Sequence, residues 1–334
     1  MENKSLGNTS LYVSELCLGT MVFGEEGSRG ADELTSERMI KRYIDAGGNF
    51  IDTADVYAQG KSEKIVGRAI EGYREELVIA TKCRFPMGTA PNMWGVSRKY
   101  IFHAVNASLE RLNTNYIDLL YLHGTTPNLV LEESLRALND LVSLGKIHYI
   151  GVSNFRAWEV MKAISISELR GWARFEAGQY QYSLVERNIE HEFTGMFLSE
   201  NISSIPWGPL GGGFLSGKYK PGDKPIEGRL AIMPDHTEEA WGRRSVDRNW
   251  KIIELMDEIK QNRGKTYPQI ALNWILQQPA VTSPIIGVRT MDQLDDNLEA
   301  IGWDLSQDEL KKLDDVSKPV TEYPYRFIMN YCLE

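Results

Sequence analysis

The sequence predicts an α/β fold in which eight short parallel strands and their helices close into one (β/α)8 TIM barrel. Three observations support this. Short apolar strands alternate with amphipathic helical stretches along the chain. Most strands carry a nearly continuous apolar core, as a sheet covered on both faces requires. No strong break in composition divides the 334 residues, so a single domain spanning residues 1–334 is expected.

The expected strands are all brief. In chain order they are Leu16–Leu18, Phe50–Asp52, Leu77–Thr81, Ile117–Leu122, Ile147–Gly151, Glu176–Gln179, Ile202–Pro206 and Ser283–Ile286. An open, doubly wound sheet is the competing fold. No GxGxxG motif follows the first strand, and eight strand–helix units suit closure better than an open sheet.

Helical spacing of apolar residues marks several intervening helices. Ser97 is a candidate N-cap for the first of them. The apolar stripes are Ile101, Ala104, Val105, Leu109 and Leu112; then Leu131, Leu135, Leu138 and Val142; then Ile252, Leu255, Met256 and Ile259. Each stripe would face the sheet and leave polar residues toward solvent.

Three segments lie outside the repeating pattern. An N-terminal β-hairpin, with Asn8 in its turn before Leu11–Val13, is expected to cap the bottom of the barrel. Gly208–Ser245 is too long and too rich in glycine, proline and charge for a plain connection, and such loops are usually functional. The C-terminal tail, with Tyr323, Tyr325 and Phe327, is a candidate to fold back over the barrel.

Net charge and cysteine content limit the kinds of partner and compartment that the sequence predicts. The formal charge of −9 argues against nucleic acid or an anionic membrane as the main partner. Three widely spaced cysteines without a CxxC pair suit a reducing compartment and argue against a disulfide framework or a metal site. The first residues contain no apolar segment typical of a secretory signal, so the cytoplasm is the expected location.

Polar residues at the carboxyl ends of the strands suggest where chemistry takes place. Asp52, Lys82 and His123 end three successive strands, and Tyr57 follows Asp52 closely. Asp52 and Lys82 could neutralise each other, and the ammonium is expected to lower the pKa of Tyr57. A tyrosine beside a histidine is a plausible proton donor to a carbonyl oxygen. A single such residue is more often structural, and spacing alone leaves both roles open.

At these residues the sequence resembles the aldo-keto reductases, in the branch that is similar to aryl-alcohol dehydrogenases and potassium-channel β subunits. The resemblance covers nearly the whole chain in order. Its segments are FIDTADVY (Phe50–Tyr57), VIATK (Val78–Lys82), YIDLLYLHG (Tyr116–Gly124), IGVSNF (Ile150–Phe155), QYQYSLVERN (Gln179–Asn188), PLGGGFLSGKY (Pro209–Tyr219) and IIGVRTMDQLDDN (Ile285–Asn297).

The resemblance implies a catalytic tetrad of Asp52, Tyr57, Lys82 and His123 and reduction of an aldehyde or ketone by hydride transfer from NADPH. Tyr57 would donate the proton, Lys82 and Asp52 would tune its phenol, and His123 would orient or polarise the carbonyl. Preorganised donors would then meet the charge that develops on the substrate oxygen.

The resemblance also implies a set of cofactor contacts. Ser153, Asn154 and Gln179 would bind the nicotinamide carboxamide, and Tyr182 would stack on the ring. The segment from Leu210 through Gly212 to Lys218 would cradle the pyrophosphate, since glycine permits close backbone approach. Further candidates for the cofactor site are Gly19, Thr20, Met21, Trp207, Arg229 and Gly287.

The adenosine end of the cofactor is assigned to Arg289, Gln293 and Asn297, which share one face if Thr290 opens a helix. Arg289 suits a 2′-phosphate because its planar fork can form two charge-assisted hydrogen bonds. NADPH is therefore expected over NADH. Gln293 stands where some relatives carry a second arginine, which makes that preference less strict.

Substrate selection is expected to lie in the variable loops. Phe23, Trp94 and Trp207 are candidate apolar walls for a small-molecule carbonyl compound. The chain reads Gly124-Thr125-Thr126 after His123, where many relatives have a bulky or charged residue followed by an acidic one. This departure should alter the pocket wall rather than the tetrad.

Two other functions fit parts of the sequence. A cofactor-binding regulatory or redox-sensing subunit would retain the same tetrad, and brisk turnover of several carbonyls would exclude it as the sole role. A metal-assisted lyase or phosphosugar isomerase would use the barrel and the Gly211–Gly213 cluster but would leave the tetrad unexplained.

Overall fold

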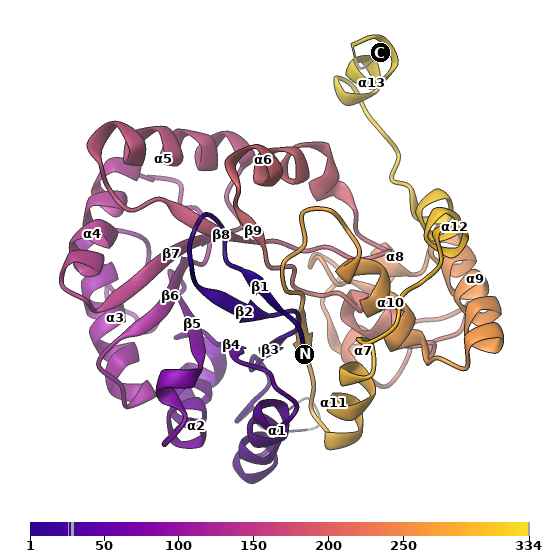
Figure 1. Ribbon diagram of the computed structural model, residues 1–334, viewed down its shortest axis with the longest axis horizontal. Coiled ribbons are helices and arrows are strands. Elements are labelled where there is room, and N and C mark those ends of the chain that lie inside the picture. The colour runs from indigo at the N-terminus through magenta and orange to yellow at the C-terminus, as the bar shows by residue number, and fades with distance from the viewer. Residues whose placement is uncertain (26, 28–29, 333–334) are drawn as a thin grey trace.

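The computed structural model describes residues 1–25, 27 and 30–332. Its centre is a sheet of eight parallel strands in the order β10-β3-β4-β5-β6-β7-β8-β9, with helices around the outside (Figure 1). The strands are β3 (Cys17–Gly19), β4 (Phe50–Asp52), β5 (Val78–Cys83), β6 (Ile117–Leu122), β7 (Ile147–Ser153), β8 (Phe175–Gln179), β9 (Ser203–Ser204) and β10 (Ile285–Gly287). The predicted α/β barrel is confirmed.

Hydrogen bonds between the segments of β9 and β10 close the barrel. The Ile285 amide donates to Pro206 O at 2.8 Å, and the Thr282 amide donates to Ser204 O at 2.9 Å. The β9 strand is the least regular, since only two of the five residues predicted for it form ladder pairs. The first and last residues of β4 and β6 match the predicted ranges, and those of β3, β5, β7, β8 and β10 differ by one or two positions.

One helix or helical pair follows each strand and covers the outer face of the sheet (Figure 1). After β3 to β8 these are α1 (Glu33–Asp45), α2 (Lys61–Ala69), α3 (Arg98–Leu112), α4 (Leu131–Ser143), α5 (Ala157–Arg170) and α6 (Phe193–Glu200). After β9 come α9 (Asp247–Arg263) and α10 (Tyr267–Leu276), and after β10 come α11 (Met291–Leu298) and α12 (Gln307–Ser317).

The α3 helix shows why the predicted helices form. Ser97 is its N-cap, and the Ser97 side chain accepts a hydrogen bond from the Tyr100 amide. The helix ends at Asn113, whose φ of 51° is left-handed. Most of the predicted stripe is buried against the sheet, including Ile101 and Leu112. Burial of this face, more than helix propensity, stabilises the element.

The N-terminal hairpin closes the bottom of the barrel as predicted. It pairs β1 (Asn3–Ser5) with β2 (Tyr12–Ser14), and Leu6 and Val13 enter the barrel's interior apolar cluster. The Gly7 amide donates to Ser203 Oγ at 2.7 Å. Gly7 has a φ of 54°, and a Cβ there would lie 2.4 Å from Glu176 O, so this close approach requires glycine.

The long Gly208–Ser245 segment folds into short helices rather than a plain loop. They are the 3-10 helix η4 (Gly211–Ser216), α7 (Arg229–Ile232) and α8 (Trp241–Arg244). Elsewhere in the described residues, 3-10 turns occur as η1 (Tyr57–Gly60), η2 (Arg74–Glu76) and η3 (Asn188–His191). A second apolar cluster packs this segment against α9, α10 and α12 and includes Phe214, Trp241, Met256, Trp274 and Leu313.

The C-terminal tail does not fold over the barrel, so that expectation is wrong. The last helix, α13 (Tyr325–Tyr331), stands away from the body at the end of an extended segment (Figure 1). Tyr323, Phe327 and Tyr331 are exposed. One hydrogen bond, from Tyr325 Oη to Glu192 Oε1 at 2.9 Å, joins the helix to the start of α6. Within the described ranges, every helix is too short or too polar to cross a membrane.

Candidate active site

The carboxyl ends of neighbouring strands bring the predicted tetrad together. Asp52 ends β4, Lys82 lies near the end of β5, and His123 follows the last residue of β6 directly. Tyr57 opens η1, where Ala58 and Gln59 have φ angles of 45° and 54°. Left-handed backbone at two residues that are not glycine is uncommon and costs energy. This tight turn holds the phenol of Tyr57 over the barrel.

The Lys82 ammonium is the centre of the site. Its side chain is fully buried and forms an ion pair with the Asp52 carboxylate. It also donates to Thr53 O at 2.8 Å and to Tyr57 Oη at 3.1 Å. Burial alone lowers the pKa of Lys82, but Asp52 and Tyr57 more than offset this, so the pKa lies above its ordinary value. Lys82 is therefore charged at neutral pH.

The expected lowering of the Tyr57 pKa is wrong. Burial disfavours the phenolate and raises the pKa of Tyr57, and this exceeds the opposing effect of Lys82. The negative charge of Asp52 adds to the rise. The prediction failed because it counted the charge of Lys82 but not the burial of the phenol or the carboxylate behind it. Tyr57 is consequently a neutral phenol with an available proton at physiological pH.

His123 completes the polar group as a neutral imidazole. Burial lowers the pKa of His123 well below its ordinary value, and the charges of Lys82 and Arg84 act in the same direction. Its ring centroid lies 6.0 Å from that of Tyr57, with the planes at 80°. The buried Nδ1 atom has no hydrogen-bond partner. The neutral ring can donate one hydrogen bond to a group placed between it and Tyr57.

Three residues expected at the carboxamide lie beside the tetrad. The Gln179 side-chain amide donates to Asp52 Oδ2 at 2.8 Å, and Ser153 Oγ donates to Gln179 O at 2.7 Å. Asn154 Nδ2 donates to Ser153 Oγ at 2.9 Å and to His123 O at 3.1 Å. The amide groups of Gln179 and Asn154 therefore form a continuous hydrogen-bonded rim from β6 to β8.

A glycine-rich turn after β9 provides a place for phosphate groups. Gly211, Gly212 and Gly213 have φ angles of 58°, 70° and 87°. The Lys218 Nζ atom lies 3.2 Å from where a Cβ on Gly213 would be. Successive amides in such a turn and a nearby ammonium are suited to bind an anion. These residues fit the pyrophosphate of a dinucleotide.

Arg229 is held by an ion pair with the buried carboxylate of Glu239. Its charge also lowers the pKa of Tyr57 slightly, against the larger effect of burial. Glu239 Oε1 lies 3.2 Å from where a Cβ on Gly212 would be. This pair therefore joins the long loop to the glycine-rich turn near the mouth of the barrel.

The residues expected at the adenosine end surround the start of α11. Thr290 is its N-cap and accepts a hydrogen bond from the Gln293 amide, so the predicted helix start is confirmed. Gln293 Oε1 accepts from the Arg289 amide at 3.0 Å. Arg289 is exposed and close enough to Lys218 to lower the pKa of that ammonium, after burial, which has the larger effect. Asn297 is buried on the same helix.

The first barrel strand contributes backbone rather than free side chains. Gly19 ends β3, and a Cβ there would meet Ile285 Cγ2 at 2.5 Å. The Thr20 hydroxyl is buried and donates to Asp52 O at 3.1 Å. Met21 is half-buried at the mouth, and Gly287 at the end of β10 has nothing within 4 Å of its Cβ position. The open space at Gly287 suits a ligand that passes close to the backbone.

The candidate apolar walls have different environments. Phe23 is fully buried in the outer core, with no exposed surface, so its assignment to the substrate site is wrong. The sequence could not reveal this because the loop after β3 turns Phe23 into the outer apolar cluster, which also contains Met39 of α1 and Ile65 of α2. Trp94 is 42% exposed in the loop after β5. Trp207 is half-buried above the barrel's interior cluster.

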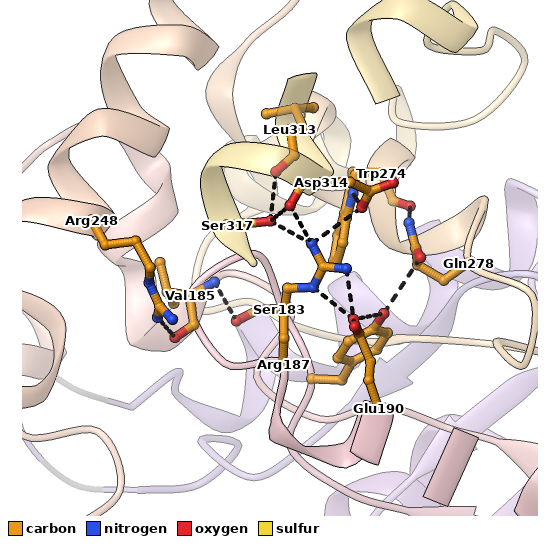
Figure 2. Close-up of polar contacts among 11 residues, drawn as sticks. Ser183, Val185, Arg187, Glu190, Arg248, Trp274, Gln278, Leu313, Asp314 and Ser317 are labelled. Atoms are coloured by element: carbon orange, nitrogen blue, oxygen red, sulfur yellow. Dashed lines mark hydrogen bonds and ion pairs between the residues drawn. The ribbon is translucent and has the colours of Figure 1, made fainter. Parts of the chain in front are cut away.

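The placement of Tyr182 does not match stacking on a nicotinamide. Its ring packs against Trp274 in the second apolar cluster, with centroids 5.5 Å apart, and is 3% exposed. Its hydroxyl donates to Glu190 Oε1 at 2.7 Å. Glu190 in turn pairs with Arg187, which also donates to Ser317 Oγ (Figure 2). Tyr182 thus belongs to a buried structural network outside the barrel mouth.

Arg84 was not among the predicted site residues, although it lies on the same rim. It follows β5 directly, two positions after Lys82, and its charge contributes to the low pKa of His123. Its Nε and Nη2 atoms donate to Thr125 O at 3.2 and 3.0 Å. The spacing from Lys82 could have identified Arg84 as a site residue, because residues two apart on a strand share a face.

These features define the class of the protein as an α/β barrel with a buried Lys–Asp pair, a neutral phenol beside it and a glycine-rich turn at the carboxyl ends of the strands. The sequence matches the Aldo/keto reductase family profile over residues 15–318. It is 33% identical to versiconal hemiacetal acetate reductase of Aspergillus parasiticus, covering 97% of this chain and 99% of the relative.

Two further relatives have similar identity. Norsolorinic acid reductase of Aspergillus flavus is 34% identical, covering 96% of this chain and 82% of the relative. The uncharacterised oxidoreductase YrpG of Bacillus subtilis is 34% identical, covering 95% of this chain and 96% of the relative. The chain belongs to the aldo/keto reductase family. It is an oxidoreductase of a family that acts on carbonyl groups of small molecules with a nicotinamide cofactor.

Proposed function

We propose that this protein, acting as one domain, reduces an aldehyde or ketone to an alcohol with NADPH, and that Tyr57 donates the proton. The observation that carries the proposal is the 3.1 Å hydrogen bond from Lys82 Nζ to Tyr57 Oη, made by an ammonium that also binds Asp52. A buried ammonium in contact with a phenol has a clear chemical use, because it stabilises the phenolate that remains after proton transfer.

The direction of the hydrogen bonds supports Tyr57 as the donor. An ammonium has three protons and cannot accept. Lys82 directs them to Asp52, Thr53 O and Tyr57 Oη. Tyr57 Oη therefore accepts from Lys82, and its own hydrogen points elsewhere. During reduction this O–H bond breaks, the proton moves to the carbonyl oxygen, and the phenolate is left beside Lys82.

His123 is proposed to position the carbonyl oxygen. As a neutral imidazole it donates a hydrogen bond without adding a second positive charge beside Lys82. Because the rings of Tyr57 and His123 are 6.0 Å apart, one oxygen atom can be approached by both side chains. Two donors placed before the reaction would stabilise the charge that develops on that oxygen.

The cofactor, when bound, supplies the hydride through its nicotinamide ring. Ser153, Asn154 and Gln179 are proposed to hold its carboxamide, since the side-chain oxygen of Gln179 can still accept a hydrogen bond while its amide donates to Asp52. Trp207 has a half-buried ring above the barrel interior and replaces Tyr182 as the proposed stacking residue.

The phosphates are assigned to the opposite side of the mouth from β5. Leu210 through Lys218, including Gly212, would bind the pyrophosphate, with Arg229 and Glu239 joining the loop over it. Arg289 would bind the 2′-phosphate, with Gln293 and Asn297 near the adenosine. Gly19, Thr20, Met21 and Gly287 would line the path of the cofactor along β3 and β10.

The substrate is proposed to be a small carbonyl compound with some apolar surface, which would contact Trp94 and Trp207. The names of two relatives mention a hemiacetal acetate and norsolorinic acid, which are chemically different. These names therefore support the reaction type more than any one substrate. The cytoplasm is the proposed location, in line with three free cysteines, two of them buried.

The experiment is a fluorescence titration with NADPH and NADH, followed by NADPH oxidation at 340 nm against a panel of aldehydes and ketones. Tight NADPH binding and turnover of at least one carbonyl would support the proposal. Tight binding without any turnover would favour the regulatory or redox-sensing subunit. Absence of binding to either dinucleotide would contradict both functions.

A further inference from the structure

Arg84 places a fixed positive charge on the rim of the candidate active site. It directly follows β5, and its side chain is half-buried. Two hydrogen bonds to Thr125 O, at 3.2 Å from Nε and 3.0 Å from Nη2, hold the guanidinium beside the chain that follows β6. A guanidinium has five N–H donors, so three remain after these bonds. They can bind a ligand without loss of the existing contacts.

No carboxylate within the described ranges pairs with this arginine. The segment from His123 to Val130 contains no acidic residue. The acid that contacts Thr125 is Glu159, and it already pairs with Arg156 at 3.2 Å. The half-buried guanidinium thus has backbone and ring contacts but no counter-charge among the described residues, so an anionic group of a ligand can pair with it.

The ring of Phe85 contacts both the Arg84 guanidinium and the His123 ring. Arg84 Cζ is 4.7 Å from the centroid of Phe85, and the same ring contacts His123 edge-on at 4.8 Å. Gly124 presents no side chain beside Arg84. A Cβ on Gly124 would lie 3.8 Å from Arg84 Nε. A substrate whose carbonyl meets His123 can thus extend toward the arginine.

The backbone at Arg84 is a second, independent observation. Its φ is 156°, at the edge of the region that glycine adopts readily and other residues adopt rarely. Glycine would be the unstrained choice for this position. Strained backbone of this kind persists where the surrounding structure holds it and clusters at ligand-binding positions. We therefore attribute the presence of arginine at this strained position to a contact that its side chain makes.

We propose that Arg84 binds a carboxylate of the substrate and makes this protein a reductase of carbonyl compounds that carry an acid group. The inference rests on the proposed carbonyl reduction and adds the substrate class. A planar guanidinium binds a carboxylate through two parallel hydrogen bonds. The cofactor's phosphates are not the ligand, because Lys218 and Arg289 follow β9 and β10, across the barrel from β5.

The experiment compares matched aldehydes that differ in one charge. The kcat/KM values of 4-carboxybenzaldehyde, 3-carboxybenzaldehyde and methyl 4-formylbenzoate are measured for the wild type, Arg84→Met and Arg84→Lys. Loss of a charge-assisted pair should reduce kcat/KM for the better acid by about 10- to 100-fold in Arg84→Met, mainly through KM. The neutral ester should change by less than about threefold, and Arg84→Lys should recover part of the loss.

A control variant separates local binding from general electrostatics. Arg170→Met removes the same charge from an exposed pair with Glu132 on the outer helices and should leave both substrates unchanged. An equal decrease for acid and ester in Arg84→Met would overturn the proposal and assign Arg84 to support of Thr125 and His123. Equal wild-type kcat/KM values for acid and ester would also overturn it.

A binding measurement keeps the two proposals distinguishable. The affinity of 4-(hydroxymethyl)benzoate, which cannot be reduced, is measured by calorimetry for wild type and Arg84→Met. Weaker binding to the variant, with no change for the matching methyl ester, would support the carboxylate site even if no aldehyde is turned over. In that case the proposed carbonyl reduction alone would fail. Unchanged binding of the carboxylate would overturn the role of Arg84.

Discussion

Lys82 shows how one side chain can organise several others. It is the only hydrogen-bond donor in the described part of the chain that contacts both Asp52 and Tyr57. Burial makes its charge costly unless it is paired, and Asp52 supplies that pair. Because Asp52 also accepts from Gln179, the position of the ammonium is fixed from two sides. The phenol of Tyr57 is therefore held in one place before any substrate binds.

Tyr57→Phe tests the proposed proton donor. The variant should lower kcat for carbonyl reduction by at least about 100-fold, since general acid catalysis typically contributes that much or more. The Kd for NADPH should stay within about threefold. Because burial raises the pKa of Tyr57, the wild type should show no loss of reduction from deprotonation of this group at pH 7 to 9.

The matched control for this variant is Tyr331→Phe, which removes an exposed hydroxyl far from the barrel. It should leave kcat and the Kd unchanged. If Tyr57→Phe retained near-normal kcat, the proton would have to come from another group, with His123 the next candidate.

Arg289→Ala tests the preference for NADPH. A charge-assisted contact to a 2′-phosphate is worth about 1.5–3 kcal/mol, so the Kd for NADPH should rise by roughly 10- to 100-fold. NADH lacks this phosphate and should be affected by less than about threefold. Fluorescence titration of both dinucleotides gives the two values. Equal weakening of both would place the 2′-phosphate at another residue.

The sequence predicted which residues form the tetrad, but it predicted the wrong direction for the pKa shift of Tyr57. Asp52, Tyr57 and Lys82 lie within one motif and its neighbouring strand, so parallel pairing brings them together. The pKa direction of Tyr57 depends on burial, which is a property of the folded chain and not of the local sequence. Phe23 was misplaced for the same reason, because its orientation follows from packing in the outer apolar cluster rather than from local sequence.

At the scale of elements, the inner strands depend on small residues that allow large neighbours. Gly151 on β7 is paired with Tyr121 on β6. A Cβ on Gly151 would lie 2.5 Å from the Tyr121 ring, closer than packed atoms can approach. The barrel interior is filled by this ring, which is fully buried.

Gly151→Ala should therefore lower the free energy of unfolding by about 1–3 kcal/mol, the usual cost of adding a methyl group to a packed core. Urea denaturation measures the change. Gly242→Ala is the control, because nothing lies within 4 Å of its Cβ position, and it should be neutral or slightly stabilising. Unchanged stability of Gly151→Ala would mean that the Tyr121 ring can move aside without cost.

The boundaries of an element could be predicted where the local sequence carries a clear signal and not where they depend on long-range pairing. Strands with a continuous apolar run, such as β6, were predicted to the residue, because burial on both faces leaves a clear signal. β9 was predicted over five residues but pairs over two. Its closing contacts come from Pro206 and from the segment before β10, which is more than 70 residues away along the chain. Such long-range pairing cannot be read from a local pattern.

At the scale of the whole molecule, a buried acid beneath the active site links stability to pH. Asp55 is fully buried, and burial together with the neighbouring Glu63 raises its pKa to about 7. The charged groups that face it are Glu63 and Arg111, and the Tyr100 hydroxyl donates to it at 3.3 Å. One of its oxygens, Oδ1, has no hydrogen-bond partner.

The sign of the pH effect follows from the two pKa values. In the unfolded chain Asp55 titrates near 3.8, and in the fold near 7. Between these values the native state holds a proton that the unfolded state lacks, so acidification favours the native state. Above pH 7 both states are ionised, and the buried carboxylate costs up to about 4 kcal/mol, since one pKa unit corresponds to 1.36 kcal/mol.

Asp55→Asn removes this cost and should raise the free energy of unfolding at pH 8 by as much as about 4 kcal/mol. The gain should shrink steadily as the pH falls from 7 toward 4, where the wild-type carboxyl is protonated. Urea unfolding of both proteins at several pH values measures the difference, and Asp223→Asn, at an exposed position, should show none. A gain that stays constant with pH would contradict ionisation as its cause and assign the effect to the new amide's hydrogen bonds.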